Sequence, residues 1–188
     1  YAAALDLATG RELWRPHFPS SRPHQSGERT SRAAPTPAVD AHAVYFLFDS
    51  GDLHALTHDG DPLYHVDLNQ RLGRIENGHD FGCSPRQSRD SLVIFVHHFS
   101  PSYLLCLDKL TGKTRWKQDF GKEGGWNTPV LTADQKVLLI QRSGGVAAYE
   151  AATGKLLWED IRSFSRDSAI PSLSLQGDVA VIPSQTKG

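Results

Sequence analysis

The chain has 188 residues, of which 39% are hydrophobic and 22% charged, and its formal net charge at pH 7 is -1. This composition is typical of a globular protein, and the nearly balanced charge argues against nucleic acid as a partner. No run of apolar residues is long enough for a transmembrane segment. The sequence also lacks methionine and a signal-peptide stretch, so we expect it to be a piece of a longer or processed protein.

One motif recurs along the chain, clearest at 5–14, 107–116 and 149–158 and degraded at 56–64. Each of the three clear copies has an acidic residue, two variable residues and Thr-Gly. The degraded copy keeps only Asp-Gly. Glycine permits the positive φ of a tight turn and the acidic side chain accepts bonds from turn amides, which predicts a β-hairpin. An aromatic residue follows each glycine by four positions, always on one face of the second strand. The pairs are Gly10 and Trp14, Gly60 and Tyr64, Gly112 and Trp116, and Gly154 and Trp158.

The aromatic residues are separated by 50, 52 and 42 residues along the chain. This period predicts an all-β propeller with four short antiparallel strands in each blade. A second marker, a proline just before a short strand candidate, recurs with a similar spacing. Proline is tolerated at the start of a strand, where its missing N–H costs no ladder hydrogen bond. The markers are Thr36-Pro37, Ser84-Pro85, Thr128-Pro129 and Ile170-Pro171.

In chain order, the motif divides the sequence into the outer half of a blade, three whole blades and the inner half of a blade. The predicted units are 1–19, 34–68, 82–120, 126–162 and 169–188, with inner strands at 38–39, 86–87, 130–131 and 172–173. Residues 15–33 are predicted to form an exposed, irregular connection rather than a binding loop for an anionic partner. The two halves could close a four-bladed ring, but we favour an open arc of a larger ring.

The repeat Asp-x-x-Thr-Gly-x-x-x-Trp, with Ser/Thr-Pro opening the next blade, resembles the pyrroloquinoline-quinone-like (PQQ-like) β-propeller repeat family. That family includes quinoprotein dehydrogenases and the outer-membrane assembly lipoprotein of Gram-negative bacteria. The resemblance implies seven or eight blades and an extracytoplasmic bacterial location. It also implies that Trp14, Trp116 and Trp158 dock each blade against its neighbour, a role in which Tyr64 departs from the pattern.

Ligands of propellers generally gather at the mouth of the central channel, near the inner strands. Arg86 is the most suggestive candidate, because a charged side chain on an inner strand must find water or a partner. Trp126 offers a stacking surface at the end of an inter-blade loop. The candidate contacts for a partner are Arg32, His79, Asp80, Arg86, Trp126, Asn127 and Asp167, although each could instead be a loop residue or a strand cap.

Neither a metal site nor a disulfide is predicted. The nine histidines are scattered, and adjacent His97 and His98 would point to opposite faces of a strand. Cys83 and Cys106 should be about 10 Å apart with a whole strand between them, beyond the reach of a disulfide. We therefore expect two small buried thiols.

The sequence contains no Gly-x-Ser-x-Gly motif, phosphate loop or dinucleotide fingerprint, and no catalytic residue is predicted. We expect a noncatalytic scaffold without a cofactor, whose inter-blade loops bind a protein partner. Remaining blades of the parent chain or a second copy are further expected partners. The alternatives are a quinoprotein dehydrogenase module that binds PQQ and calcium, although the Cys-Cys dipeptide of those enzymes is absent, and a sensor of carbohydrates or other small ligands.

Overall fold

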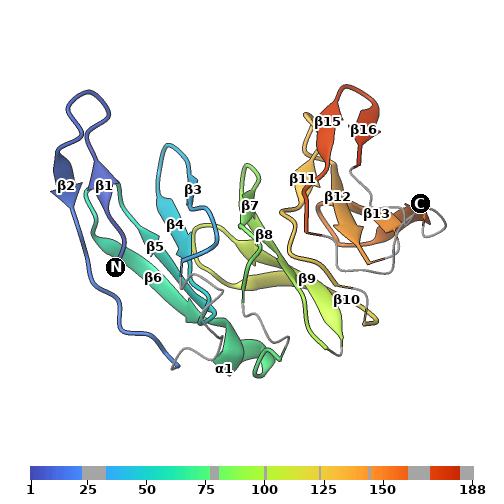
Figure 1. Ribbon diagram of the computed structural model, residues 1–188, viewed down its shortest axis with the longest axis horizontal. Helices are drawn as coiled ribbons and strands as arrows, with labels where there is room; N and C mark the ends of the chain where they lie inside the picture. The colour runs from blue at the N-terminus through green and yellow to red at the C-terminus, as the bar shows by residue number, and fades with distance from the viewer. Residues whose placement is uncertain are drawn as a thin grey trace.

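The computed structural model describes residues 1–22, 33–76, 81–99, 101–122, 124–143, 145–160 and 170–182. This part of the chain forms antiparallel sheets arranged side by side in an arc, with one short helix (Figure 1). A two-stranded sheet comes first, three four-stranded sheets follow, and a second two-stranded sheet comes last. The predicted all-β architecture of four-stranded propeller blades is confirmed. Within the described ranges, no helix is long and apolar enough to cross a membrane.

The strands of each sheet are hydrogen-bonded in chain order, from an inner to an outer strand. The first sheet contains β1 (Ala4–Leu5) and β2 (Glu12–Trp14), and the last contains β15 (Ser174–Gln176) and β16 (Val179–Val181). The four-stranded sheets are β3 (Ala38–Val39), β4 (Val44–Leu47), β5 (Asp52–Leu56) and β6 (Pro62–Asp67); β7 (Arg86–Gln87), β8 (Ser91–Val96), β9 (Ser102–Asp108) and β10 (Thr114–Phe120); and β11 (Val130–Leu131), β12 (Val137–Arg142), β13 (Gly145–Glu150) and β14 (Leu156–Asp160).

The middle strands of the second and third four-stranded sheets are buried almost throughout because each of these sheets packs against a neighbour on both faces, whereas β4 of the first four-stranded sheet alternates between buried and partly exposed residues. Every residue of β8 is buried, and its side chains alternate between two cores. Leu92 and Ile94 pack in the core shared with the preceding sheet. Val93 and Phe95 pack in the core shared with the following sheet. One strand therefore joins two apolar layers.

The predicted hairpin turns are present. Asp108 Oδ1 accepts hydrogen bonds from the Thr111 amide (2.9 Å) and the Thr111 hydroxyl (2.8 Å). Asp6 makes the same two bonds with Thr9. Gly112 follows with φ +66°, a conformation that is costly for a residue with a Cβ. The Asp-x-x-Thr-Gly motif thus sets the turn by local hydrogen bonding.

The last inner strand is two residues later than predicted, at Ser174–Gln176 rather than 172–173. A row of hydrogen bonds between neighbouring sheets explains the shift. The amide of Thr36 donates to Ser84 Oγ (2.8 Å), and the amide of Thr128 donates to Ser172 Oγ (2.9 Å). Ser172 therefore occupies the position that Ser84 and Thr128 occupy in their sheets, so aligning the chain on Pro171 was wrong.

Two further features differ from the sequence predictions. A helix, α1 (Leu68–Leu72), follows β6, because the Asp67 side chain caps the Gln70 amide (3.0 Å) and Leu68 is buried. Residues 15–22 are irregular as predicted, but they are not simply exposed, since Phe18 stacks on His54 with ring centroids 4.1 Å apart. Residues 23–32 of this connection lie outside the described ranges.

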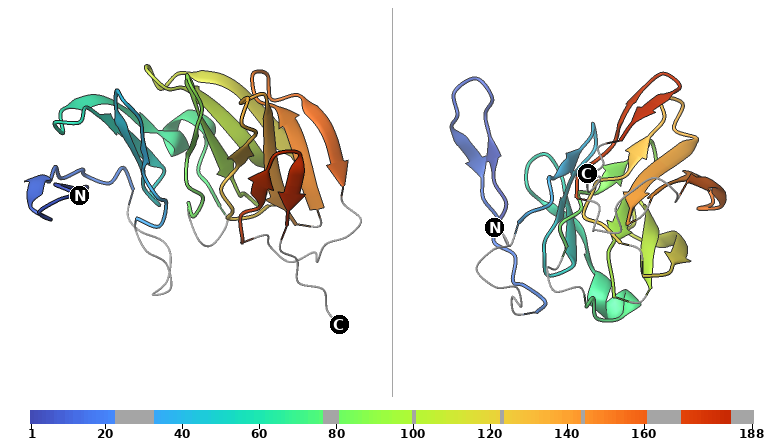
Figure 2. Two further views of the ribbon diagram at one scale, coloured as in Figure 1. Left: turned by 90° about the horizontal axis from the view of Figure 1, so that it is seen from above. Right: turned by 45° about the vertical axis from the view of Figure 1, so that its right-hand side comes forward.

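The arc is open in this chain. The sheet β1–β2 and the sheet β15–β16 lie at opposite ends of the row and share no hydrogen-bonded strands (Figures 1 and 2). Of the two interpretations that the sequence left open, the arc therefore describes the chain. Both cysteines are buried and free, as predicted.

Candidate functional site

The contact between neighbouring sheets repeats along the arc. The first three aromatic rings of the motif each lie over the turn glycine of the next sheet and donate a hydrogen bond to a carbonyl of that turn. Trp14 Nε1 donates to the His58 carbonyl (2.7 Å), Tyr64 Oη to that of Lys109 (3.0 Å) and Trp116 Nε1 to that of Ala151 (3.2 Å). The rings are so close that an added Cβ would lie 2.9 Å from Trp14 at Gly60, 2.7 Å from Tyr64 at Gly112 and 2.5 Å from Trp116 at Gly154.

The same contact is unfilled at both ends of the described arc. Trp158 on β14 is 50% exposed, and Leu157 beside it is 47% exposed. At the other end, a Cβ added to Gly10 would meet no described atom within 4 Å. Leu13 on β2 is also 53% exposed. One end therefore presents a free ring and the other a free glycine turn.

The inner strands carry the candidate surface for a partner. Arg86 on β7 is half-buried, and within the described part of the chain no hydrogen bond or ion pair engages its guanidinium. The next residue, Gln87, donates from Nε2 to the Val39 carbonyl on β3 (2.7 Å) and so ties two inner strands together. Val39 is 54% exposed. This inner edge, formed by Val39, Arg86 and Gln87, combines an exposed apolar group with a free cation.

Two predicted contact residues have structural roles instead. Asn127 is only 1% exposed, donates from Nδ2 to the Gln141 carbonyl and accepts from the Gln141 amide (3.3 Å), so it cannot serve as a surface contact. Trp126 is half-buried and packs into the core between the second and third four-stranded sheets. A Cβ on Gly82 would lie 2.7 Å from its ring, and His97 meets it edge-on at 4.6 Å. Its ring is therefore engaged rather than open for stacking.

The other predicted contacts, Arg32, His79, Asp80 and Asp167, lie outside the described residues. Arg86 is therefore the predicted contact that the structure describes as accessible and free.

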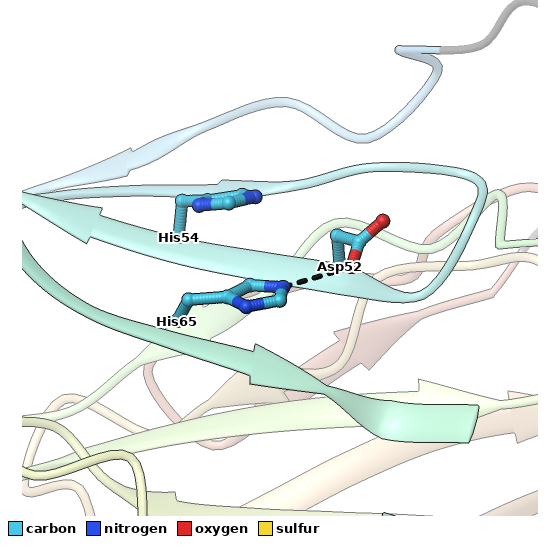
Figure 3. Close-up of side chains that lie close together, drawn as sticks. All are labelled: Asp52, His54 and His65. Carbon is cyan, nitrogen blue, oxygen red and sulfur yellow. Dashed lines mark hydrogen bonds and ion pairs between the residues drawn. The ribbon is translucent and has the colours of Figure 1, made fainter. Parts of the chain in front are cut away.

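Sequence reasoning missed a polar cluster on the first four-stranded sheet, β3–β6. Asp52 and His54 lie on β5, and His65 lies directly opposite His54 on β6 (Figure 3). One ligand atom from each residue lies within 4.8 Å of the other two. The two imidazole rings are stacked, with centroids 4.4 Å apart and an angle of 16° between their planes. The register between strands brings together histidines that are eleven positions apart, and a scan for short motifs does not detect that pairing.

Burial and hydrogen bonding determine the charges in this cluster. Burial, together with a smaller effect of the neighbouring His65, lowers the pKa of His54 to about 4, so His54 is neutral at pH 7. Burial raises the pKa of Asp52, but bonds from the Ser50 hydroxyl, the Ser21 amide and His65 outweigh it and lower the pKa overall. Asp52 is thus a carboxylate beside two imidazoles. A cavity of about 300 Å³ adjoins Asp52 and His54.

The residues described here do not fit PQQ with calcium. Calcium takes six to eight oxygen ligands, whereas the one group of three close metal-ligand side chains in the described ranges offers two imidazoles and one carboxylate. Cys83 and Cys106 are separate and buried, and no Cys-Cys dipeptide occurs.

Face-to-face packing of four-stranded antiparallel sheets in an arc makes this chain part of a β-propeller. Residues 100–166 match a family model described as outer membrane protein assembly factor BamB. Together with the structural neighbours below, this match confirms the resemblance to the PQQ-like repeat. Curated protein sequences gave no match.

The solved structures that share the fold include both kinds of PQQ-like propeller. Quinohemoprotein alcohol dehydrogenase from Comamonas testosteroni has a TM-score of 0.65 and 13% identity, over 88% of this chain and 32% of that one. A europium-containing methanol dehydrogenase has a TM-score of 0.66 and 14% identity, over 88% and 38%. BamB from Moraxella catarrhalis has a TM-score of 0.56 and 22% identity, over 83% and 44%. The chain thus spans less than half the length of each of these structures.

Proposed function

We propose that this chain is a noncatalytic propeller segment that acts as a protein-interaction scaffold. The observation that carries the proposal is the inner edge formed by Val39, Arg86 and Gln87. A half-buried guanidinium without a partner is costly, and an incoming carboxylate would relieve that cost. The exposed Val39 side chain beside it supplies apolar area for the same contact. The partner is therefore a protein segment with an acidic group next to an apolar one.

The match to the BamB model supports placing this scaffold in the cell envelope. The matched stretch, residues 100–166, includes β9 and β10 and the whole of the third four-stranded sheet. By that similarity, the proposed role is in the assembly of outer membrane proteins. The free ring of Trp158 and the free turn at Gly10 provide docking positions for remaining blades of a parent chain or for a second copy.

Site-specific photo-crosslinking tests the scaffold function. A photo-reactive residue is placed at Arg86 and, as a control, at Lys113, which is exposed in the turn before β10 of the same sheet. In the source cells, position 86 should form a specific adduct with an envelope protein and position 113 should not. Equal adducts at the two positions, or none at 86, would contradict the proposal.

A stability measurement separates binding from structure at the same residue. Because Arg86 has no partner within the described chain, Arg86→Ala should not lower the free energy of unfolding by more than about 0.5 kcal/mol. A loss well above that value would show that the side chain supports the fold instead.

Cofactor titration addresses the dehydrogenase alternative. PQQ and calcium are added together while tryptophan fluorescence is measured. Saturable quenching at micromolar concentration would replace the scaffold proposal with that of a quinoprotein module.

A further inference from the structure

The side chains of Asp52, His54 and His65 lie on one face of the β3–β6 sheet. Asp52 and His54 are two residues apart on β5, so they project from the same side of the strand. His65 is the cross-strand neighbour of His54 on β6. We propose that these three residues bind a divalent transition-metal ion of the zinc class (Figure 3).

His54 provides an observation that is independent of the clustering. His54 is 8% exposed, and its Nε2 has no hydrogen-bond partner in the described structure. A buried polar nitrogen without a partner is destabilising, by about 1–3 kcal/mol for a typical group. The ring cannot easily turn away, because it is stacked between Phe18 at 4.1 Å and His65 at 4.4 Å. A metal ion would use the lone pair that the protein leaves unused.

Asp52 is held in place as a supported ligand. The Ser50 hydroxyl (2.5 Å) and the Ser21 amide (2.9 Å) both donate to its Oδ2. This leaves Oδ1, which contacts His65 Nε2 at 2.8 Å. Outer hydrogen bonds of this kind orient the carboxylates that bind metals. Oδ1 is therefore the oxygen that would face the ion.

To hold zinc, His65 would have to move and turn, because its ring is stacked on that of His54 at an angle of 16° and a metal ion lies in the plane of each imidazole that binds it. Two bonds of about 2.1 Å at a tetrahedral angle place the ligand atoms about 3.4 Å apart. The Oδ1 to Nε2 distance of 2.8 Å would have to increase by roughly half an ångström to reach that value. His65 can provide this movement, since its side chain is 46% exposed.

The donor atoms select the kind of ion. Two imidazole nitrogens and one carboxylate oxygen suit zinc and similar transition metals, whereas calcium and magnesium prefer oxygen donors. The cavity of about 300 Å³ reaches Asp52 and His54 and gives access to a fourth coordination position. Water or a small anion would fill that position, and Arg22 also lines the cavity.

Metal binding to the whole chain can be measured directly. Zinc is titrated in competition with a chromophoric chelator, and cobalt(II) is titrated while visible absorption is recorded. We expect one tight equivalent of zinc, and with cobalt the intense bands of a low-symmetry, four-coordinate ion. Zinc should also raise the melting temperature of the protein.

Three variants test whether these residues hold the ion. His65→Ala removes a ligand from an exposed position and should leave the fold intact. His54→Phe removes the ring nitrogens but keeps a ring that can stack on Phe18. His42→Ala is the matched control, because His42 is exposed between β3 and β4 of the same sheet and donates to Asp40 Oδ1 through its backbone amide, which the substitution keeps.

Both ligand variants should lower zinc affinity by more than roughly 100-fold, the upper end of the losses seen for residues that only support a ligand. They should also lose the cobalt bands and the zinc-induced rise in melting temperature, while His42→Ala keeps all three. His54→Phe should be at least as stable as the wild type without metal. Unchanged zinc affinity in folded His65→Ala and His54→Phe, or no saturable binding to the wild type, would overturn the proposal. The contact between Asp52 and His65 would then be a structural hydrogen bond only.

Discussion

Trp116 lies over Gly154 in the next sheet of the arc. Its Nε1 donates to the Ala151 carbonyl at 3.2 Å, and a Cβ on Gly154 would come within 2.5 Å of its ring. The glycine therefore serves two purposes, because it allows the turn its φ of +74° and also leaves room for the tryptophan. The residues that form the hairpin turn therefore also form the surface on which the preceding sheet packs.

Gly154→Ala and Gly10→Ala separate these two purposes. Both glycines have similar positive φ, +74° and +70°, but only Gly154 has a ring above it. Gly10→Ala should cost about 1–2 kcal/mol from backbone strain. Gly154→Ala should cost a further 1–3 kcal/mol, roughly, because the methyl group collides with Trp116. Urea unfolding of both variants measures the difference, and equal losses would show that the ring contact does not restrict the turn.

Trp116→Ala and Trp158→Ala test the docking role predicted from the sequence. Trp116 is partly buried in the core between two sheets, so its removal should destabilise the chain by about 3 kcal/mol or more. Trp158 is 50% exposed, and its removal should cost about 1 kcal/mol or less. Thermal and urea unfolding provide the comparison. A large loss in Trp158→Ala would mean that another copy already covers that ring in solution.

Lys109→Met tests a buried ion pair that joins two sheets. Lys109 Nζ lies 2.6 Å from Asp40 Oδ2, with side-chain exposures of 7% and 16%. Removing the ammonium leaves a poorly solvated carboxylate, which should cost about 3 kcal/mol. The double variant Lys109→Met with Asp40→Asn should recover part of this loss, because the unpaired charge is gone. If the double variant is no more stable than the single one, the charge of Asp40 is not the cause.

Acid should weaken the same contact in a defined range. Burial raises the pKa of Asp40, but the bonds from Lys109 and the amides of His42 and Ala43 outweigh it and lower the pKa from 3.8 to about 2. A lowered pKa stabilises the fold above pH 3.8, and this stabilisation is lost as the pH falls towards 2. Unfolding free energies measured between pH 2 and 5 should therefore fall with acidification. In Lys109→Met this dependence should shift to higher pH.

Local chemistry made most of the architecture predictable. The Asp-x-x-Thr-Gly turn depends on hydrogen bonds between residues three positions apart, such as Asp108 and Thr111, so it can be recognised in the sequence without knowledge of the fold. The regular spacing of the turns then implied repeated four-stranded sheets. The short helix α1 was missed, although Asp67 is a typical N-cap residue, because five helical residues leave little periodicity.

The candidate sites were less predictable, since they depend on which strands become neighbours. Asn127 looked like a surface loop residue until its pairing with Gln141, fourteen positions away, placed it in the interior. The last inner strand was misplaced because a proline is merely permitted near the start of a strand and does not fix where the strand begins. The structure shows that the hydroxyl of Ser172 marks it through a bond to the next sheet.

By itself the sequence determined the hairpins, their period and the ring that follows each glycine, because these depend on turn geometry and on the alternation of side chains along a strand. Only the tertiary structure decided that Trp116 meets Gly154 while Trp158 and Gly10 remain unmatched, and that His54 faces His65 beside Asp52. Contacts between sheets and across strands join residues that are distant in the chain. Their register is fixed by packing over the whole arc and not by any short stretch.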